Sequence, residues 1–469
     1  MSQDHKLSIK QLYTYFKEAL KGEENNFTTG SIRKAIFMLS IPMILEMLME
    51  SIFAIVDIAF VSQVSTNAVA TIGLTESVVT LVYAVAIGVS MAATAMVARR
   101  IGEKDPDGAS KVAVQAIFLG VFIASIVSVI GIIYPKEILG LMGGEPELIA
   151  EGYGYTQILL GGNSTIMLLF LINAIFRGAG NASVAMKALI LSNGLNIILD
   201  PMFIFGFGPI PAYGVEGAAI ATTIGRGTAV LFQLGILFYG WSAIKIKFKD
   251  LVLRTTIMLN LLKISLGGIG QFIIATSSWI FLMRIMSEFG SDVLAGYTIA
   301  IRVVMFTMLP CWGMSNAAAT LVGQNLGAEQ PERAETSVWK TGKYNAWFMG
   351  IVSIIYLVFA KQIIKLFTDE IIVIENGALC LQIVAVGYIF YGYAMVVIQS
   401  FNGAGDTKTP TIINFICFWL FQLPFAYIGA IYFEFGPQGV FWAITAAEVL
   451  IAIIGILVFR KGTWKAVKV

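Results

Sequence analysis

The stretch Gly178-Ala179-Gly180-Asn181 recurs later in the chain as Gly403-Ala404-Gly405-Asp406. Three further landmarks recur at the same offset in residue number, that from 178 to 403. They are Thr66 to Ala70 with Ser291 to Ala295, Gly88-Val89-Ser90 with Gly313-Met314-Ser315, and Gly102, Pro106 and Ala109 with Gly327, Pro331 and Ala334. One constant offset across four landmarks indicates that the chain contains two copies of one structural unit.

Composition places both copies in a membrane. Hydrophobic residues make up 57% of the chain and charged residues 13%, whereas an ordinary soluble protein has about 25% charged residues. The apolar runs are long enough for helices that cross a hydrocarbon core of about 30 Å. We predict an all-α integral membrane protein with twelve transmembrane helices in two six-helix repeats. The predicted spans are 35–61, 68–98, 112–134, 149–176, 184–206, 215–240, 260–288, 293–323, 338–360, 376–400, 411–433 and 438–459.

The distribution of Lys and Arg predicts the orientation of these spans. If the N-terminus is cytoplasmic, 25 of the 31 Lys and Arg residues fall in cytoplasmic segments, and only Lys136, Lys361 and Lys365 fall in outside loops. Basic loops stay preferentially in the cytoplasm. We therefore predict a multi-pass protein of the cell (inner) membrane with both termini cytoplasmic. Because each repeat has six spans, the two repeats enter the membrane in the same direction and are parallel.

Five segments follow from this topology. They are a cytoplasmic N-terminal segment (1–32), an N-terminal lobe (33–240), a basic cytoplasmic linker (241–259), a C-terminal lobe (260–460) and a cytoplasmic tail (461–469). Apolar residues at roughly helical spacing make the first segment either an amphipathic helix at the membrane surface or a polar tail. The single histidine, His5, lies in this segment, which excludes a histidine proton relay within the membrane and a zinc site built from histidines.

Three acidic residues interrupt the first span. Glu46, Glu50 and Asp57 fall within about 40° of one another around a helix of 3.6 residues per turn. An ionisable group near the centre of a membrane helix costs at least about 2.5–3.5 kcal/mol. These side chains therefore either line an aqueous cavity, with Glu46 and Glu50 near one mouth, or pair with buried arginines to hold the bundle together.

A second polar cluster lies in the fifth span. Asn196 and Asp200 are four residues apart and face the same way. Pro201 cannot donate a hydrogen bond, so it frees the carbonyl of Ile197. The cluster is either a site for a proton or small cation or a kink whose polar groups satisfy one another. Pro42 offers a second place for a helix to bend.

These features together resemble the multidrug and toxic compound extrusion (MATE) family of secondary antiporters, over about residues 33–460. The motifs that carry the resemblance are Leu39-Ser40-Ile41-Pro42, Val56-Asp57, Arg177 to Asn181, Asn196 to Pro201, Gly214 to Ala219, Gly323 to Ala328 and Phe401 to Asp406. The resemblance implies two six-helix lobes arranged as a V that export cationic or amphiphilic compounds in exchange for protons or sodium. It also implies that coupling occurs at Asp57, Asp200, Asn196, Asn173 and Thr222.

The resemblance favours one branch of the family. Sodium-coupled members carry acidic residues in the seventh and tenth helices, whereas this chain has Ser265 and Gln271 in the seventh span and no acid within 376–400. This difference favours the DNA-damage-inducible-type branch and coupling in the N-terminal lobe.

The chemistry of the two aspartates suits exchange. Burial favours the neutral, protonated form of a carboxyl group, whereas a bound cation favours the charged form. Proton and substrate therefore oppose each other's binding at Asp57 and Asp200, and exchange follows from this linkage. Sodium can replace the proton, because Asp57, Asn196, Asp200 and Thr222 all offer oxygen ligands.

Other functions compete with antiport. A lipid-linked saccharide flippase of the same superfamily is the nearest alternative, although it typically has more spans and a more basic cavity. A membrane-embedded aspartate protease is a second one, although the parallel repeat does not suit an enzyme. Arg284 and Arg302 in the C-terminal lobe either attract an anion or neutralise Glu288 and Asp292. We expect a monomer surrounded by lipids, with no nucleic-acid partner and no cofactor besides the coupling ion.

Overall fold

The computed structural model describes residues 9–22, 27–240 and 243–469. His5 and Leu7, at the start of the N-terminal segment, lie outside the described residues, and so do 241–242 at the start of the linker. Within the described residues the regular elements are all helices, apart from an isolated bridge between Phe207 and Ile210, and turns and loops connect them. The predicted all-α membrane fold is confirmed.

The first half contains nine α-helices and a short 3₁₀ turn among the described residues. They are α1 (Ile9–Lys21), α2 (Ile32–Val61), α3 (Thr66–Gly102), α4 (Pro106–Ile133), α5 (Pro135–Leu141), α6 (Pro146–Gly161), α7 (Asn163–Gly178), α8 (Ala182–Phe205), α9 (Val215–Tyr239) and η1 (Phe248–Asp250). The helix α1 packs against α2 and α8, where Lys187 Nζ donates to the carbonyl of Lys21.

The second half contains eight α-helices and four short 3₁₀- or π-helical segments among the described residues. Its elements are α10 (Thr255–Met286), η2 (Ser287–Phe289), α11 (Ser291–Gly327), α12 (Pro331–Lys365), α13 (Ile371–Val386), α14 (Tyr388–Ala404), α15 (Lys408–Asn414), η3 (Phe415–Gln422), α16 (Leu423–Tyr427), η4 (Ile428–Tyr432), α17 (Pro437–Arg460) and η5 (Thr463–Ala466). The segments η3 and η4 are π-helical stretches within one span, Lys408–Tyr432.

Ten described helices are long and apolar enough to cross a membrane, and the bent pair α13 and α14 makes eleven. The helix α2 is not among them, but its 30 residues exceed the length that a hydrocarbon core requires.

Two spans that the sequence predicts as continuous helices, 149–176 and 376–400, are broken. Gly162 separates α6 from α7, and Gly387 separates α13 from α14 with a bend of 60°. The two glycines are equivalent positions of the two repeats, so the break belongs to the repeated unit. A Cβ atom would lie 2.7 Å from Thr223 at the first break and 2.9 Å from Thr445 at the second. Glycine therefore lets the sixth helix of each half approach the broken fourth.

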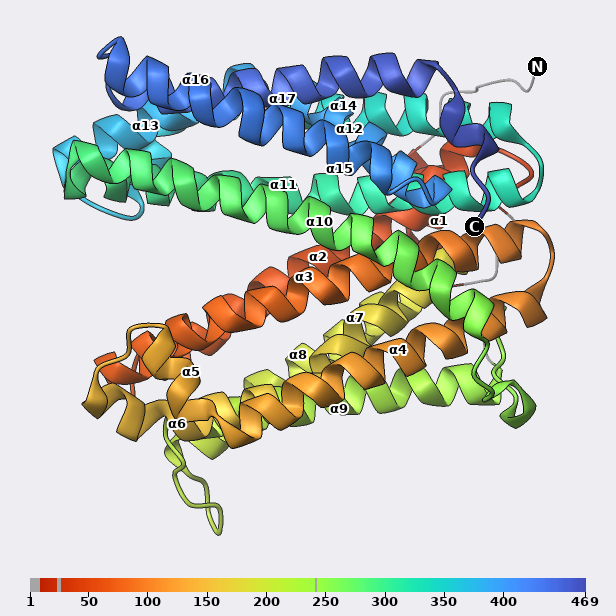
Figure 1. Cartoon of the computed structure of the whole chain (residues 1–469), viewed down its shortest axis with the longest axis horizontal. Helices are drawn as coiled ribbons and strands as arrows, with labels where there is room; N and C mark the ends of the chain where they lie inside the picture. The colour runs from red at the N-terminus through yellow and green to blue at the C-terminus, as the bar shows by residue number, and fades with distance from the viewer. Residues whose placement is uncertain (1–8, 23–26, 241–242) are drawn as a thin grey trace.

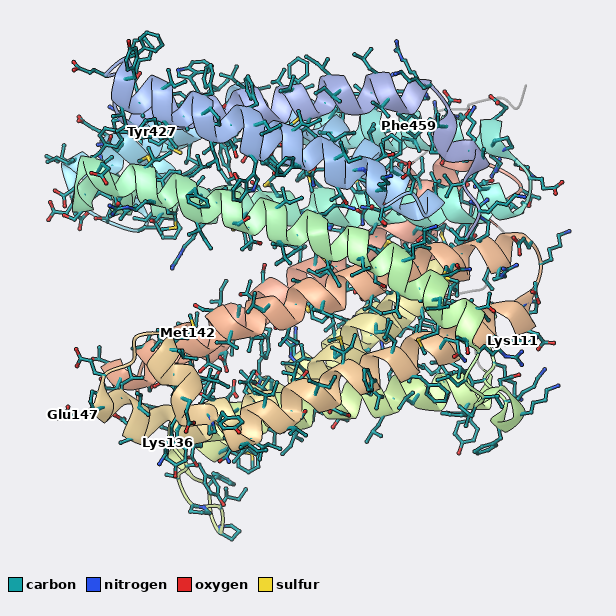
Figure 2. All side chains as sticks on the ribbon, in the orientation of Figure 1. Lys111, Lys136, Met142, Glu147, Tyr427 and Phe459 are labelled. Atoms are coloured by element: carbon teal, nitrogen blue, oxygen red, sulfur yellow. The ribbon has the colours of Figure 1, made fainter. Side chains whose placement is uncertain are left out.

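The helices form two lobes, as Figure 1 shows, with α2–α9 in one and α10–α17 in the other. The ribbons of the lobes meet at the end that holds the C-terminus and diverge toward the opposite end. The first helix of each repeat leans on the other lobe, because α2 packs against α11 and α10 packs against α3. In Figure 2, Lys111 lies at the end where the lobes meet and Lys136 at the opposite end of the same lobe. The charge pattern predicts opposite sides of the membrane for these two residues.

Hydrogen bonds related by the repeat join the lobes where they meet. Arg99 of α3 donates to the carbonyls of Ala404 and Val467, at 3.3 and 2.9 Å. Gln324 of α11, the equivalent of Arg99 in the second repeat, donates to the carbonyl of Gly178 at 3.0 Å. The same position of the repeated unit therefore donates a hydrogen bond from each lobe to the other.

Candidate transport site

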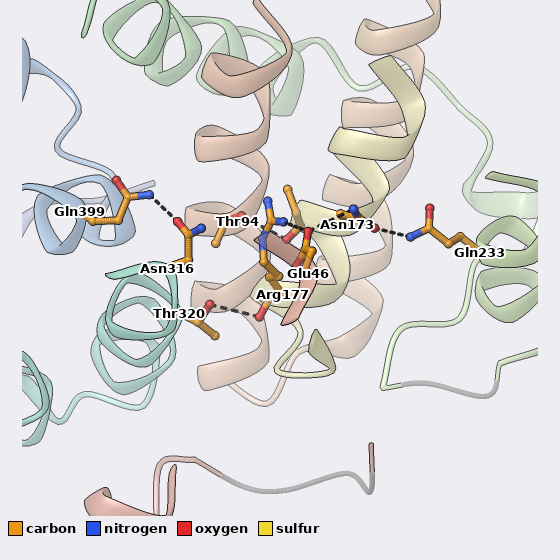
Figure 3. A network of polar contacts seen from close by, with 9 residues as sticks. Glu46, Thr94, Asn173, Arg177, Gln233, Asn316, Thr320 and Gln399 are labelled. Carbon is orange, nitrogen blue, oxygen red and sulfur yellow. Dashed lines mark hydrogen bonds and ion pairs between the residues drawn. The ribbon is translucent and has the colours of Figure 1, made fainter. Parts of the chain in front are cut away.

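The first polar centre of the N-terminal lobe surrounds Glu46 on α2 (Figure 3). Arg177 Nη1 lies 2.5 Å from Glu46 Oε1, and Asn173 Nδ2 lies 3.1 Å from the same oxygen. Gln233 of α9 donates to Asn173 Oδ1. The side chain of Glu46 is 2% exposed and that of Arg177 is 11% exposed. Glu46 is therefore half of a buried ion pair, which loses far more free energy when one partner is removed than when both are replaced.

The second centre lies one turn further along α2. Glu50 Oε1 is 3.1 Å from Nη2 of Arg226, whose guanidinium also lies 4.8 Å from the centre of the Phe53 ring. The Tyr83 side chain lies close enough to interact electrostatically with the same guanidinium. Sequence reasoning gave Arg226 no role, although an unpaired cation is not tolerated within a span. The position of Arg226 within an apolar span could therefore have predicted that it has an acidic partner.

The third centre joins α2, α8 and α9 around two aspartates. Asn196 Nδ2 donates to Asp200 Oδ1 at 3.0 Å and lies 3.4 Å from Thr222 Oγ1. Asp57 lies close enough to Asp200 for the two carboxyl groups to interact electrostatically. Asp57 is 6% exposed and Asp200 is 0% exposed. Neither forms an ion pair among the described residues.

The third centre has spare oxygen atoms. Oδ1 of Asp57, Oδ2 of Asp200 and Oδ1 of Asn196 are buried and accept no hydrogen bond. Buried acceptors without a donor are costly, and hard oxygen ligands suit sodium or a proton. The donor set of Asp57, Asn196, Asp200 and Thr222 therefore fits a small monovalent cation.

Asn173 does not join this cluster. The resemblance groups it with the two aspartates, but its side chain contacts Glu46 and Gln233 in the first centre. The five residues expected to act in coupling are thus divided between two centres. The physical reason is that Asn173 lies on α7 beside Arg177, one turn away, and shares its acidic partner.

Two further residues near the aspartates carry no motif in the sequence. Tyr155 of α6 is buried and interacts electrostatically with Asp57 and Asp200. Glu76 of α3 interacts with Asp57 in the same way. Both come from helices that only the folded lobe brings against α2 and α8.

The two prolines occupy the expected helices. Pro42 is buried within α2, and Pro201 follows Asp200 within α8. Each removes one backbone donor from its helix.

A central cavity of about 210 Å³ lies between the lobes. Glu50 and Arg177 line it from the N-terminal lobe, and Asn316 and Gln399 line it from the C-terminal lobe. Figure 3 shows that Gln399 donates to Asn316 beside Arg177, at 2.7 Å. Glu50 therefore combines an ion pair with a position on the cavity wall, whereas Glu46 is enclosed.

The in-span arginines of the C-terminal lobe do not build an internal anion site. Arg284 is 77% exposed and pairs with Glu288 at 3.2 Å, and Arg302 is exposed on α11. Arg284 thus neutralises an acidic neighbour one turn away.

Comparison with known proteins agrees with this architecture. A family model described as MatE matches residues 42–202 and 269–428, one segment in each half. The probable multidrug resistance protein NorM of Thermotoga maritima is 28% identical over 97% of this chain and 97% of its own. The multidrug export protein MepA of Staphylococcus aureus is 23% identical over 92% of this chain and 94% of its own. An FAD transporter of Shewanella oneidensis is 23% identical over 92% of this chain and 95% of its own.

Solved structures match over the whole fold. A crystal structure of MATE in the straight conformation has a TM-score of 0.87 and 28% identity, over 94% of this chain and 98% of that chain. An outward-facing multidrug resistance MATE transporter of the MOP superfamily has a TM-score of 0.87 and 27% identity, over 95% of this chain and all of that chain. Since the family model covers well over half of the residues, in both repeats, the chain belongs to the MatE family.

Proposed function

We propose that this chain is a secondary active multidrug efflux transporter. It exchanges a cationic or amphiphilic compound for protons or sodium by alternating access. The single observation that carries the proposal is the contrast along α2. Glu46 and Glu50 are paired with arginines, whereas Asp57 and Asp200 have spare buried oxygen atoms and no ion-pair partner among the described residues.

The exchange follows from that contrast. A proton or sodium ion removes one of the two negative charges of Asp57 and Asp200, and loss of that ion leaves an additional buried negative charge that a monovalent cationic compound can compensate. Pro201 weakens the backbone of α8 beside Asp200, and Pro42 weakens that of α2 about four turns from Asp57, so both helices can bend when the site changes occupancy.

Orientation and branch are part of the same proposal. The chain lies in the inner membrane as a monomer with both termini cytoplasmic, so the divergent end of the lobes faces outward. Gln271 of α10 hydrogen-bonds to Asn402 where sodium-coupled relatives need an acid, which favours the DNA-damage-inducible-type branch. A lipid-linked saccharide flippase is not favoured, because the arginine at the central cavity, Arg177, is already paired with Glu46.

Efflux of ethidium from proteoliposomes tests the proposal. A proton gradient and a sodium gradient are imposed separately on wild type, Asp57→Asn and the control Asp369→Asn, which changes an exposed loop residue. We expect one gradient to drive efflux in wild type and the control, and Asp57→Asn to abolish it. Wild-type protein that moves ethidium under neither gradient would contradict antiport. Full efflux in Asp57→Asn would show that Asp57 is not the coupling residue.

A further inference from the structure

The central cavity between the lobes has two buried oxygen atoms in its wall that lack a hydrogen-bond partner among the described residues. They are Oε2 of Glu50 on α2 and Oγ of Ser90 on α3, and both residues line the cavity. The Glu50 side chain as a whole is 27% exposed. Nearly all buried polar atoms in proteins are hydrogen-bonded, so an exception calls for an explanation. The two oxygens need hydrogen-bond donors that the fold itself does not supply.

Ser90 differs from its equivalent in the second repeat. Ser315 occupies the same position of α11, and its hydroxyl donates to the carbonyl of Cys311 at 2.8 Å. Such a bond to the preceding turn is a common arrangement for a serine within a helix. The Ser90 hydroxyl makes no such bond, and Ser315 does not line the central cavity. The spare hydroxyl therefore belongs to the cavity wall and not to the repeated unit.

The ion pair of Glu50 uses only one of its carboxylate oxygens. Oε1 lies 3.1 Å from Nη2 of Arg226, whereas Oε2 of Glu50 and Nη1 of Arg226 are both left without a partner. The arginine lies behind the wall, with its side chain 4% exposed and its guanidinium over the Phe53 ring. The last torsion of a glutamate side chain has a broad distribution, so either oxygen can turn toward the cavity. Arg226 therefore holds the carboxylate at the wall without saturating it.

The amides that the C-terminal lobe contributes to the wall bind one another. Gln399 Nε2 donates to Asn316 Oδ1 at 2.7 Å, as Figure 3 shows. Asn402 Nδ2 donates to Gln399 Oε1 at 2.9 Å, and Asn402 Oδ1 accepts a bond from Gln271 at 2.9 Å. The spare acceptors of the wall thus lie on the side of the N-terminal lobe.

The basic residue of the wall is also occupied. Arg177 lines the cavity and pairs with Glu46, which does not line it. The side chain of Arg177 is less exposed than that of Glu50, and none of its nitrogen atoms is buried without a partner. The wall therefore lacks donors and not acceptors, and the charge beside the spare acceptors is negative. A cationic group that carries hydrogen-bond donors meets both requirements.

The rest of the wall suits the apolar part of such a compound. Met47 and Met91 contribute thioether side chains, and Phe170 and Trp312 contribute aromatic rings. Methionine side chains adapt to irregular shapes, and aromatic faces attract cations within about 6 Å of the ring. The two spare oxygens border the same cavity of about 210 Å³, so one bound molecule contacts both residues.

We propose that Glu50 and Ser90 form an amine-recognition site in the central cavity, which selects compounds whose cationic group carries N–H. A protonated primary or secondary amine donates its N–H groups to the Glu50 carboxylate and the Ser90 hydroxyl. A quaternary ammonium ion carries the same charge but leaves both oxygens without a donor. Glu50 lies seven residues before Asp57 on the same face of α2, about 10 Å along a helix, so the site adjoins the proposed coupling residues. The inference names the substrate class of the proposed function and rests on that function.

Fluorescence titration of the full chain in lipid nanodiscs with a matched pair of ligands tests the site. Dansylcadaverine carries a primary ammonium group, and its N,N,N-trimethyl derivative has the same fluorophore and charge but no N–H on the cation. Titration of nanodiscs without protein corrects for binding to lipid. We expect wild type to bind dansylcadaverine at least about tenfold more tightly, because the derivative loses hydrogen bonds to a charged group. Equal binding, or tighter binding of the derivative, would overturn the amine site.

Three variants assign the preference to its residues. Ser90→Ala removes one acceptor and no charge, and it should lower the preference at least about threefold. The matched control Ser315→Ala, at the equivalent position of the second repeat, should keep the preference of wild type. Glu50→Gln should weaken binding of both ligands and bring their affinities close together. Should Glu50→Gln misfold because Arg226 is left unpaired, Ser90→Ala still decides; an unchanged preference in that variant would overturn the site.

The amine site and the efflux function fail in different ways. Ethidium is compatible with both, because its ring amino groups donate N–H. Gradient-driven efflux of ethidium together with equal binding of the two dansyl ligands would overturn the amine site while the efflux function stands. If wild type exports neither ethidium nor dansylcadaverine under either gradient, the efflux proposal fails. The binding preference then still decides whether Glu50 and Ser90 recognise an amine.

Discussion

At the scale of residues, the chain uses acidic groups in two ways. Glu46 and Glu50 are compensated by arginines on neighbouring helices, whereas Asp57 and Asp200 form no ion pair among the described residues. A paired charge stabilises one arrangement of the helices, whereas the free energy of an unpaired charge depends on whether a proton or cation is bound to it. Stability and coupling are therefore separable by mutation.

The equivalent positions of the second repeat provide a comparison for the Glu46–Arg177 pair. In the other lobe the equivalent positions are Gln271 and Asn402, which hydrogen-bond at 2.9 Å. We predict that Glu46→Gln or Arg177→Asn alone lowers the free energy of unfolding by about 3–5 kcal/mol, because a buried charge is left unpaired. The double variant recreates the amide pair and should recover most of the loss. Thermal unfolding of the three variants measures this, and additive losses would contradict it.

Asp200 should control the pH dependence of transport. Asp200→Asn keeps the hydrogen bond with Asn196 within reach but removes the group that can hold a proton. Under the proposed exchange protons oppose ethidium binding in wild type, and we predict that this pH dependence is mostly lost in the variant. Binding measured by fluorescence anisotropy across several pH values provides the test. A wild-type pH profile in Asp200→Asn would assign the competing proton to another residue.

At the scale of elements, the α2 helix contains a local weakness. Pro42 leaves the carbonyl of Met38 without its usual helical donor. A proline in the interior of a helix costs about 3 kcal/mol relative to alanine, so its presence in a buried helix indicates a need for bending.

We predict that Pro42→Ala raises the melting temperature and slows efflux, since the restored hydrogen bond stiffens α2. Pro437→Ala is the matched control, because Pro437 begins α17 and no helical hydrogen bond is missing there. Melting temperature and the initial rate of ethidium efflux are the two measurements. A variant that is more stable and equally fast would show that α2 does not bend during transport.

At the scale of the whole molecule, the lobes are joined at one end by equivalent hydrogen bonds from Arg99 and Gln324. The alternating access that we propose requires this end to open, whereas these bonds stabilise the state observed. The close approach of α3 and α11 there depends on Gly102 and Gly327, where a Cβ atom would meet the backbone of the opposite helix.

We predict that the double variant Arg99→Ala, Gln324→Ala shifts the population toward opening at this end. The three lost hydrogen bonds together amount to about 1.5–4.5 kcal/mol. Spin labels on cysteines at 111 and 336, on α4 and α12, report the distance between the lobes after the three native cysteines, which are buried, have been replaced. Longer distances are expected in the double variant than in its parent. Unchanged distances would show that packing alone holds the lobes together.

The sequence by itself determined the repeat, the number and approximate limits of the spans and the all-helical fold. Hydrophobic length and the cost of buried charge act along the chain, so a single sequence displays both. The same cost marked Glu46, Glu50, Asp57 and Asp200 as residues in need of partners.

Only the tertiary structure decided which partners they have. Arg177 and Arg226 lie 131 and 176 residues away from the acids that they neutralise, and no local pattern encodes such a pairing. The breaks at Gly162 and Gly387 likewise depend on the approach of the sixth helix of each half. Pairing between helices depends on contacts between residues distant in sequence, and folding alone brings those residues together.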